Sequence, residues 1–492
     1  MGIIQRQGLK NTIVTFAGLL LGFASLLYIQ PHFLSAEEIG LTRVLFSLSS
    51  LVGVFLPLGI GTITVRYFPV FRNEKNGHNG FFGLILLFML TGMVVMFTIL
   101  LLAKGYFIQT YQQQSKLFTE YYLYVLPLSF IIGFNAVLTL YCNSLFKSTF
   151  PALFNEILIR ILSIILFTLY FIKFISIGLF VFLFVGVYGI QFFCLLAYVF
   201  YVDRPSIRIN YKLLANGAFR EMFTFGLWMS FVSVASLGIK FIDSLVIAKY
   251  FKLELVGIYT IAAFIPNIIE APMNALDRIA GTKISHALAH DELDEVKKIY
   301  YQSAKYLLLI GGLIFAGIVT NIQFLLQFLP PKYSGGLEVV YIISIGALFN
   351  IAGGANSQII FSSKNFWKGG ILLIGVVLFS FAMNVALVPI YGINGAAMAT
   401  AISAFLYFVS KYLIVYRNFN LQPYNRQTFY IISLIISCLL VNWLIPILNS
   451  ALINIALRTA IITTLYLMGI YFLRLAPELK GIIGTTRKLF PF

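Results

Sequence analysis

The chain has 492 residues, of which 60% are hydrophobic and only 10% are charged. A soluble domain carries about 25% charged residues, so this composition excludes a protein whose whole surface faces water. The formal net charge of +17 does not indicate a nucleic-acid partner, because the Lys and Arg residues are scattered in short clusters between apolar runs. That distribution is typical of loops that face an anionic membrane leaflet.

Apolar runs of the length that crosses a bilayer, about 20 residues, recur along the whole sequence. They predict an all-α membrane protein with about fourteen transmembrane helices. The predicted spans, in chain order, cover residues 11–31, 43–65, 80–103, 117–141, 150–172, 174–201, 221–248, 255–276, 304–329, 335–361, 369–390, 393–416, 428–449 and 452–475.

The distribution of basic residues between these spans predicts their orientation. With the N-terminus inside, about 24 of the 34 Lys and Arg residues lie in cytoplasmic segments, about seven outside and about three within spans. We therefore expect both termini in the cytoplasm. Loops are at most about 30 residues long, and the sequence contains no nucleotide-binding loop, nucleophile elbow or paired-carboxylate motif. We expect a protein that is not an enzyme.

The sequence also contains an internal repeat. A shift of 217 residues places Leu34-Ser-Ala-Glu-Glu-Ile-Gly-Leu41 on Phe251-Lys-Leu-Glu-Leu-Val-Gly-Ile258. Six spans fit into this offset, so both halves point the same way through the membrane. The repeat predicts two six-helix bundles related by a pseudo-twofold axis along the membrane normal. The predicted parts are a bundle at 1–201, a cytoplasmic linker at 202–220, a bundle at 221–416, and helices 13 and 14 with a cytoplasmic tail at 417–492.

A few charges lie within the predicted spans, where each costs about 2.5–3.5 kcal/mol on insertion scales. Lys240 and Asp243 are one turn apart in span 7. Either they neutralise each other, or they line a water-filled path. Arg160 in span 5 follows Glu156 by one turn and allows the same two interpretations. Arg458 in span 14 has no local partner, and we expect it to extend toward the membrane surface.

Basic residues also recur near the ends of spans 2 and 8, which the repeat pairs with each other. Arg43 and Arg66 belong to span 2, and Arg278 and Lys283 lie near span 8. Most such residues anchor a helix at the interface, but recurrence at corresponding places also favours a functional role. The spacing His286-Ala-Leu-Ala-His290 lacks the Glu of a zinc-protease motif, and we predict an amphipathic cytoplasmic helix with no metal site.

Two stretches resemble a known family. The first contains the opening span Asn11–Tyr28, the motif Leu34–Leu41 quoted above, and Leu58-Gly-Ile-Gly-Thr-Ile-Thr-Val-Arg-Tyr-Phe-Pro69. The second is Asn384-Val-Ala-Leu-Val-Pro-Ile-Tyr-Gly-Ile-Asn-Gly-Ala-Ala-Met-Ala-Thr400. They resemble the polysaccharide biosynthesis proteins, whose flippase superfamily also contains multidrug extrusion and lipid II flippase families. Span count and repeat extend this resemblance over essentially the whole chain.

The resemblance implies alternating access around a central cavity bounded mainly by spans 1, 2, 7 and 8. It implies a flippase of the bacterial inner membrane that moves an undecaprenyl-diphosphate-linked oligosaccharide from the inner to the outer leaflet. We then expect Lys240 and at least one of Arg43, Arg66, Arg278 and Lys283 to bind the diphosphate, with Arg160 a weaker candidate. Expected partners are the lipid-linked glycan, membrane lipids, and candidate polymerase and chain-length proteins.

Some relatives bind Na⁺ with groups on spans 7, 11 and 12. Asp243, Asn384 and Thr400 match those positions, whereas Val388 stands where such sites have a second carboxylate. Na⁺ and H⁺ are therefore the candidate coupling ions, and we expect no other cofactor.

Two other functions compete with a flippase. The first is a cation-coupled multidrug exporter of the same superfamily, which would favour an acidic or aromatic cavity over a basic one. The second is a membrane glycan polymerase or transferase, which usually has a large outer catalytic loop. The basic residues near spans 2, 7 and 8 and the short outer loops favour the flippase.

Overall fold

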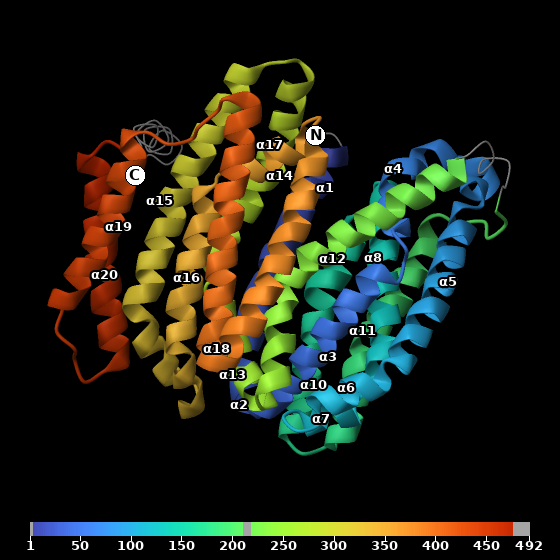
Figure 1. Ribbon diagram of the computed structural model, residues 1–492, viewed down its shortest axis with the longest axis horizontal. Coiled ribbons are helices and arrows are strands. Elements are labelled where there is room, and N and C mark those ends of the chain that lie inside the picture. Colours follow the sequence, from blue (N-terminus) through green and yellow to red (C-terminus); the bar gives the residue numbers. More distant parts are fainter. Residues whose placement is uncertain (1–2, 210–217, 476–492) are drawn as a thin grey trace, which may run out of the picture. The chain divides into compact units, whose positions relative to one another are not determined.

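The computed structural model describes residues 3–209 and 218–475, and within these residues it contains helices and no strand (Figure 1). The helices before the gap are α1 (Ile3–Ala24), α2 (Gln30–Phe33), α3 (Ala36–Phe55), α4 (Ile60–Phe71), α5 (Phe81–Leu102), α6 (Lys104–Tyr111), α7 (Lys116–Glu120), α8 (Val125–Ser144), α9 (Thr149–Leu153), α10 (Ile159–Phe171) and α11 (Ile177–Val202). Those after it are α12 (Ala218–Tyr250), α13 (Leu253–Phe264), α14 (Asn267–Ala289), α15 (Leu293–Leu325), α16 (Leu337–Ala352), α17 (Asn356–Ser362), α18 (Phe366–Phe419), α19 (Arg426–Leu444) and α20 (Ala451–Phe472).

The all-α membrane fold expected from the sequence is confirmed. Among the described residues, 12 helical segments are long and apolar enough to cross a membrane, and the bent pair α13 and α14 makes up to 13. One segment, α18, has 54 residues and a non-helical break at Gly392. At 1.5 Å per residue it would be about 80 Å long, enough for two crossings of a core about 30 Å thick. Each of the fourteen predicted spans thus overlaps a helical segment.

Contacts divide the chain into two compact units. Unit 1 comprises residues 1–261 and 380–396, and unit 2 comprises residues 262–379 and 397–492. These boundaries differ from those of the predicted bundles, because α12 packs against α3 and α4 and so belongs with the N-terminal helices. The predicted linker 202–220 is described only in part, since residues 210–217 lie outside the described residues.

Within unit 1, helix α3 packs between α8 and α12, and α8 also packs against α4 and α11. α3 is buried over most of its length. An apolar cluster joins α4, α5, α8 and α11, with Phe68, Phe81, Phe82 and Tyr141 fully buried in it. This cluster fixes the end of unit 1 at which α4 ends and α12 begins.

The repeated motif begins α3 and α13, and its two copies touch each other. A Cβ added to Gly40 would lie 2.0 Å from the carbonyl oxygen of Leu253, and one added to Gly257 would lie 2.0 Å from that of Ala36. Leu253 and Ala36 are themselves related by the offset of 217 residues, so the two contacts exchange under the repeat. Reciprocal contacts of this kind are what a local twofold axis between α3 and α13 produces.

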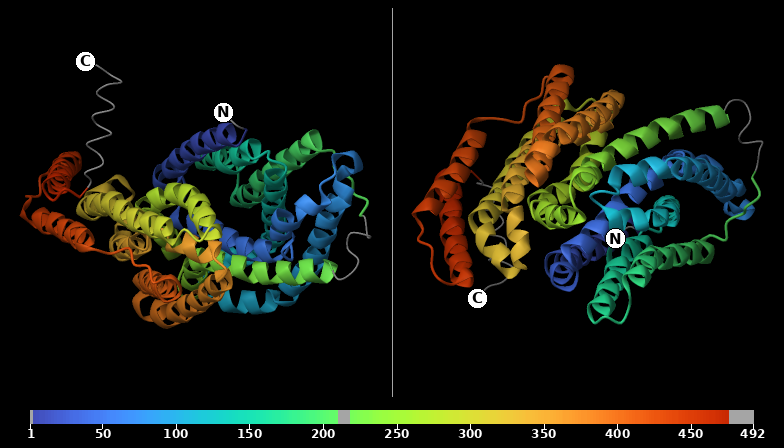
Figure 2. Two further views of the ribbon diagram at one scale, coloured as in Figure 1. Left: turned by 90° about the horizontal axis from the view of Figure 1, so that it is seen from above. Right: turned by 60° about the horizontal axis from the view of Figure 1, so that its bottom comes forward.

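Within unit 2, helix α15 packs against α14, α16, α19 and α20. The last two helices, α19 and α20, lie side by side along α15 in Figures 1 and 2. A smaller apolar cluster forms where α14, α15, α17 and α18 meet, around Ile284, Tyr300 and Ile359.

Candidate functional site

Arg43 and Lys240, predicted to bind the same diphosphate, come from different helices of unit 1 and lie next to each other. Arg43 on α3 donates from Nη2 to the carbonyl oxygen of Lys240 on α12 (3.2 Å), and from Nε to Oγ of Ser244 (3.2 Å). Its guanidinium carbon lies 5.1 Å from the ring centroid of Phe241. Arg43 therefore lies along one face of α12, while the Lys240 side chain is exposed.

Asp243, one turn beyond Lys240, belongs to a separate hydrogen-bond network. Its Oδ1 accepts from Nδ2 of Asn384 on α18 (2.9 Å), and its Oδ2 accepts from the hydroxyl of Tyr259 on α13. Asp243 and Asn384 are both buried. Among the described residues Lys240 makes no ion pair, and the cation that interacts electrostatically with the Asp243 carboxylate is Arg43.

The donor set around Asp243 only partly suits a hard cation, which prefers several oxygen ligands. The buried Oδ1 of Asn384 has no hydrogen-bond partner among the described residues and could serve as one such ligand. Val388 is buried and offers no oxygen. Thr400 belongs to unit 2.

The remaining predicted basic residues have different surroundings. Arg66 is exposed on α4, with its guanidinium carbon 4.5 Å from the ring centroid of Phe225. Lys283 is exposed on α14 in unit 2. The side chain of Arg278 lies outside the described residues.

Arg160 is paired within its own helix. Its Nη2 donates to Oε2 of Glu156 at 3.1 Å. Two glycines of α1 cover this pair: a Cβ at Gly18 would lie 2.8 Å from Cβ of Glu156, and one at Gly22 would lie 2.9 Å from Nη1 of Arg160. The glycine face of α1 thus makes room for a charge pair in the membrane.

Comparison with known proteins identifies the family. The family model described as "Polysaccharide biosynthesis protein" matches residues 32–334, more than half of the chain. The chain belongs to this family. A curated relative, an uncharacterized membrane protein of Methanocaldococcus jannaschii, is 22% identical over 91% of both chains.

Solved structures share the fold at low sequence identity. The lipid II flippase MurJ in an inward closed conformation is 17% identical, with a TM-score of 0.71 over 94% of this chain and 98% of that one. An inward-facing multidrug resistance transporter of the MATE family has a TM-score of 0.65 at 15% identity, over 83% of this chain and 98% of its own. A Vibrio cholerae MATE transporter has a TM-score of 0.54 at 15% identity, over 85% and 99%. This polysaccharide-family protein therefore has the fold of the flippase and transporter superfamily.

The sequence interpretation missed a buried lysine in unit 2. Lys411 on α18 is only 5% exposed, although it lies within an apolar span. Its Nζ donates to Oγ of Ser357 (3.2 Å) and lies 4.1 Å from the ring centroid of Tyr407. The sequence did offer one signal for this lysine. Lys411 precedes Arg417, at the predicted cytoplasmic end of the span, by six residues, which places it about 9 Å farther into the membrane along the helix.

Acidic side chains of α14 lie in the same unit. Glu270 accepts a hydrogen bond from Nδ2 of Asn350 (2.7 Å). Asp277 lies beyond Met273, where the bent span ends. Burial raises the pKa of Asp277, while a hydrogen bond from Gln358 and the charge of Lys411 oppose this shift. Unit 2 thus carries its own polar set on α14, α16, α17 and α18.

The expectation that Arg458 extends to the membrane surface is wrong. The residue is 2% exposed, and its guanidinium donates to the carbonyl oxygens of Asn442 (3.1 Å) and Ile445 (2.9 Å) and to Oδ1 of Asn442. Helix α19 ends at Leu444, so carbonyl groups at its end lack partners within the helix. Arg458 on α20 supplies them with donors, which explains why it stays buried.

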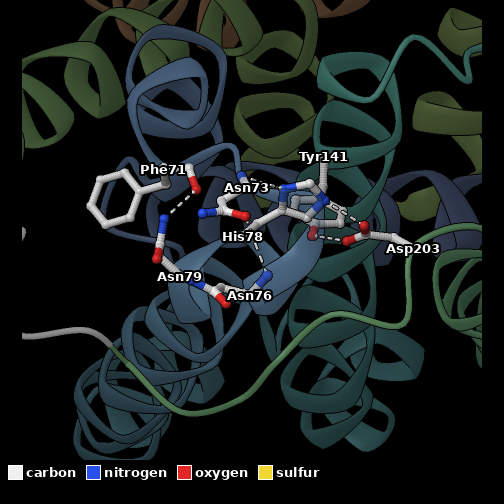
Figure 3. A network of polar contacts seen from close by, with 7 residues as sticks. All are labelled: Phe71, Asn73, Asn76, His78, Asn79, Tyr141 and Asp203. Atoms are coloured by element: carbon white, nitrogen blue, oxygen red, sulfur yellow. Dashed lines mark hydrogen bonds and ion pairs between the residues drawn. The ribbon is translucent and has the colours of Figure 1, made fainter.

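A further buried network lies in unit 1 and joins the loop after α4 to the ends of α8 and α11 (Figure 3). Nδ1 of His78 accepts from the backbone N–H of Asn73 (3.2 Å), so the proton on Nε2 is donated to Oδ1 of Asp203 (2.5 Å). Oδ2 of Asp203 accepts from the hydroxyl of Tyr141. Gly77, His78 and Asn79 all have φ values of 52–53°. This strained left-handed turn is held in place by the buried imidazole.

Proposed function

We propose that this protein is a flippase, which moves an undecaprenyl-diphosphate-linked oligosaccharide from the inner to the outer leaflet for surface polysaccharide assembly. Membership of the polysaccharide biosynthesis family supports this proposal, as does the fold shared with the lipid II flippase. The observation that carries it is the placement of Arg43 against the backbone of Lys240. The Arg43 side chain of one predicted span thereby lies at the position on α12 from which the exposed Lys240 side chain extends.

The physical requirements of the task agree with this placement. A glycan hydroxyl that loses its hydrogen bonds costs several kcal/mol in hydrocarbon, so the head group needs a polar path. A diphosphate carries about two negative charges and is attracted by Lys and Arg more strongly in a cavity bounded by lipid than in bulk water. An inside-negative potential favours outward movement of an anion by about 2.3 kcal/mol per charge per 100 mV.

The competing exporter function would require a cavity for cations. The protein shares its fold with MATE transporters, so fold alone does not separate the two. Arg43 and Lys240 repel a cationic drug, and the carboxylate of Asp243, one turn from Lys240, already accepts hydrogen bonds from Asn384 and Tyr259. These residues favour an anionic substrate.

We further propose that the protein lies in the bacterial inner membrane with both termini in the cytoplasm, and that it works beside a polysaccharide polymerase and its chain-length partners. We propose that transport occurs by alternating access and that the protein is not an enzyme. The coupling ion we propose is H⁺ rather than Na⁺, on the donor set around Asp243.

The proposal is tested by transport in liposomes. Purified protein is reconstituted with a lipid-linked glycan that carries a fluorescent label, and the fraction of label reached by an impermeant quencher is followed with time. Wild type should exchange the label between leaflets. Arg43→Ala and Lys240→Ala should each slow exchange at least tenfold, because a hydrogen bond to a charged group contributes about 1.5–3 kcal/mol.

Lys249→Ala is the matched control, since Lys249 lies on the same helix, at its C-terminal end, with its ammonium group over the ring of Tyr250. Its exchange rate should match that of wild type. Export of a cationic dye by wild type without glycan exchange would favour the drug exporter. Wild-type exchange rates in both Arg43→Ala and Lys240→Ala would show that these two basic residues do not bind the transported diphosphate.

A further inference from the structure

A hollow of about 580 Å³ lies between α4 and α12 in unit 1. Sites for small molecules typically enclose about 300–1,000 Å³. Its lining residues are Arg66, Tyr67, Arg220, Glu221, Thr224, Phe225 and Trp228. They come from the last turns of α4 and the first turns of α12, the helix ends predicted to face the cytoplasm.

The geometry of the two helices explains why a hollow forms here. They cross at Gly59 and Gly226, where a Cβ on Gly59 would lie 2.1 Å from the carbonyl oxygen of Gly226. Arg66 follows Gly59 by seven residues and Glu221 precedes Gly226 by five, so the helices run antiparallel from this crossing. Farther from the crossing, Arg66 and Tyr67 of α4 and Phe225 of α12 have large side chains, which hold the helix ends apart.

The hollow has an excess of positive charge. Among the residues that the structure describes, no acceptor takes a hydrogen bond from the guanidinium of Arg66 or Arg220. Arg66 lies against the rings of Phe225 (4.5 Å) and Tyr67 (5.3 Å), which leaves its N–H groups available. The carboxylate of Glu221 accepts from the Tyr67 hydroxyl (2.9 Å) and so holds the aromatic wall in place.

Such a combination of groups suits a phosphorylated lipid. Two guanidinium groups provide planar donors for phosphate oxygens. The two helices that line the hollow also expose apolar side chains close in sequence to its lining residues, among them Val65, Val70 and Phe231, which is typical of a surface that contacts lipid. A water-soluble phosphate would make no use of this apolar border.

We propose that this hollow binds the phosphate-bearing head group of a polyprenyl lipid in the leaflet from which transport starts. The inference rests on the proposed function and adds a loading site to it, separate from Arg43 and Lys240. Arg66 and Arg220 bind the phosphate oxygens, and Trp228 and Phe225 form the apolar wall. The polyprenyl chain remains in the bilayer along the exposed residues of α4 and α12.

Binding can be followed at the site itself, because Trp228 is one of only three tryptophans in the chain. Trp367 and Trp443 are exposed, and Phe replaces them to leave Trp228 as the reporter. The full-length protein is placed in nanodiscs of zwitterionic lipid and titrated with farnesyl diphosphate. Trp228 emission should change saturably. Arg66→Gln and Arg220→Gln should each raise the half-saturating concentration about tenfold or more, as expected for losing a charged hydrogen-bond partner.

Arg72→Gln is the matched control, because Arg72 ends the same helix but lies over the ring of Phe146. It should bind like the reporter protein, and Arg66→Lys, which keeps the charge, should bind better than Arg66→Gln. If inorganic pyrophosphate or a nucleotide sugar bound with the same affinity as farnesyl diphosphate, the site would not select a lipid, and the proposal would be wrong. An equal response to phosphatidylglycerol would show ordinary interface anchoring and also overturn the proposal.

The loading site and the flippase can fail separately. If wild type exchanges a lipid-linked glycan while Arg66→Gln and Arg220→Gln leave farnesyl diphosphate binding unchanged, the loading site is wrong and the flippase stands. If wild type exchanges no glycan but binds farnesyl diphosphate through both arginines, the hollow is a site for a polyprenyl phosphate lipid in a protein of another function.

Discussion

Two polar places in unit 1 lie close together in the chain but have opposite character. In the network of Figure 3, the side chains of His78, Asp203 and Tyr141 are buried and joined to one another by hydrogen bonds. In the hollow between α4 and α12, Arg66 and Arg220 are exposed and, within the described part of the chain, their guanidinium groups have no acceptor. One place has its charge matched inside the protein, and the other presents charge to something outside it.

The difference shows how to separate structural from functional charges in this protein. A buried carboxylate with both oxygens occupied keeps helices together, and losing it leaves donors without partners. An exposed arginine on an aromatic wall contributes little to stability but can bind an anion. Arg458, held by carbonyl groups at the end of α19, belongs to the first class.

The largest expected effect comes from Asp203. Asp203→Ala leaves the His78 and Tyr141 donors buried without acceptors, each costing about 1–3 kcal/mol, so the protein should lose about 2–6 kcal/mol of stability. Asp203→Asn keeps one acceptor and should lose less. Thermal unfolding in detergent measures both. A wild-type melting temperature for Asp203→Ala would mean that the network is not structural.

A smaller loss is expected at the contact between the repeats. Gly40→Val and Gly257→Val each place side-chain atoms against a backbone carbonyl 2.0 Å from the new Cβ, and such overpacking costs about 1–3 kcal/mol. Because the two contacts exchange under the repeat, the two losses should be similar, and the double variant should lose less than their sum. Thermal unfolding of the three variants tests this. A loss at only one glycine would argue against the local twofold axis.

Asp243 is buried like Asp203, yet the family resemblance gives it a role in ion coupling. Asp243→Asn keeps the shape and an acceptor for Tyr259, so stability should fall by about 1 kcal/mol at most. Glycan exchange should lose its dependence on an imposed proton gradient. Tyr259→Phe is the matched variant, since it removes the hydroxyl but not the carboxylate, and the gradient dependence should survive in it. Unchanged gradient dependence in Asp243→Asn would leave the carboxylate a purely structural group.

The smallest effect on stability is expected at the hollow. Arg66→Gln and Arg220→Gln remove exposed charges that have no acceptor within the described part of the chain, and should change the free energy of unfolding by less than about 0.5 kcal/mol. The same thermal unfolding experiment provides the comparison with Asp203→Ala. A large destabilisation by either arginine variant would place the hollow in the same class as the network.

The elements of this fold could be predicted from sequence because length and hydrophobicity determine where a helix crosses a membrane. Each predicted span overlaps a helix, and the turn predicted at 390–393 contains the break at Gly392. Local pairs could be predicted too, since Glu156 and Arg160 lie one helical turn apart. The spacing along one helix is visible in the sequence.

The partners of most buried charges could not be predicted. Tyr259 and Asn384 reach Asp243 from helices 16 and 141 residues away in the chain. Arg458 donates hydrogen bonds to backbone carbonyl groups. Because every residue has such a group, no pattern of side chains in the sequence indicates which ones it binds. The hollow likewise depends on how α4 and α12 cross, and the sequence shows the two glycines without showing that they meet.

The comparison of the two places assumes that both lie on the cytoplasmic side, and labelling tests this without altering either. In a variant without Cys142, Cys194 and Cys438, single cysteines are placed at Arg208 and Tyr391, both exposed. Arg208 lies next to the network, since its carbonyl oxygen packs against Gly80. Tyr391 lies in the 390–393 turn, which carries no Lys or Arg.

Because basic loops stay inside, an impermeant maleimide added to intact cells should label Tyr391→Cys and should reach Arg208→Cys only after the membrane is opened. Labelling of both from the same side would mean that the number of spans between them is wrong. Labelling of Arg208→Cys alone from outside would move both polar places to the outer face. The hollow would then receive a lipid head group after transport rather than before it, and its arginines would belong to release instead of loading.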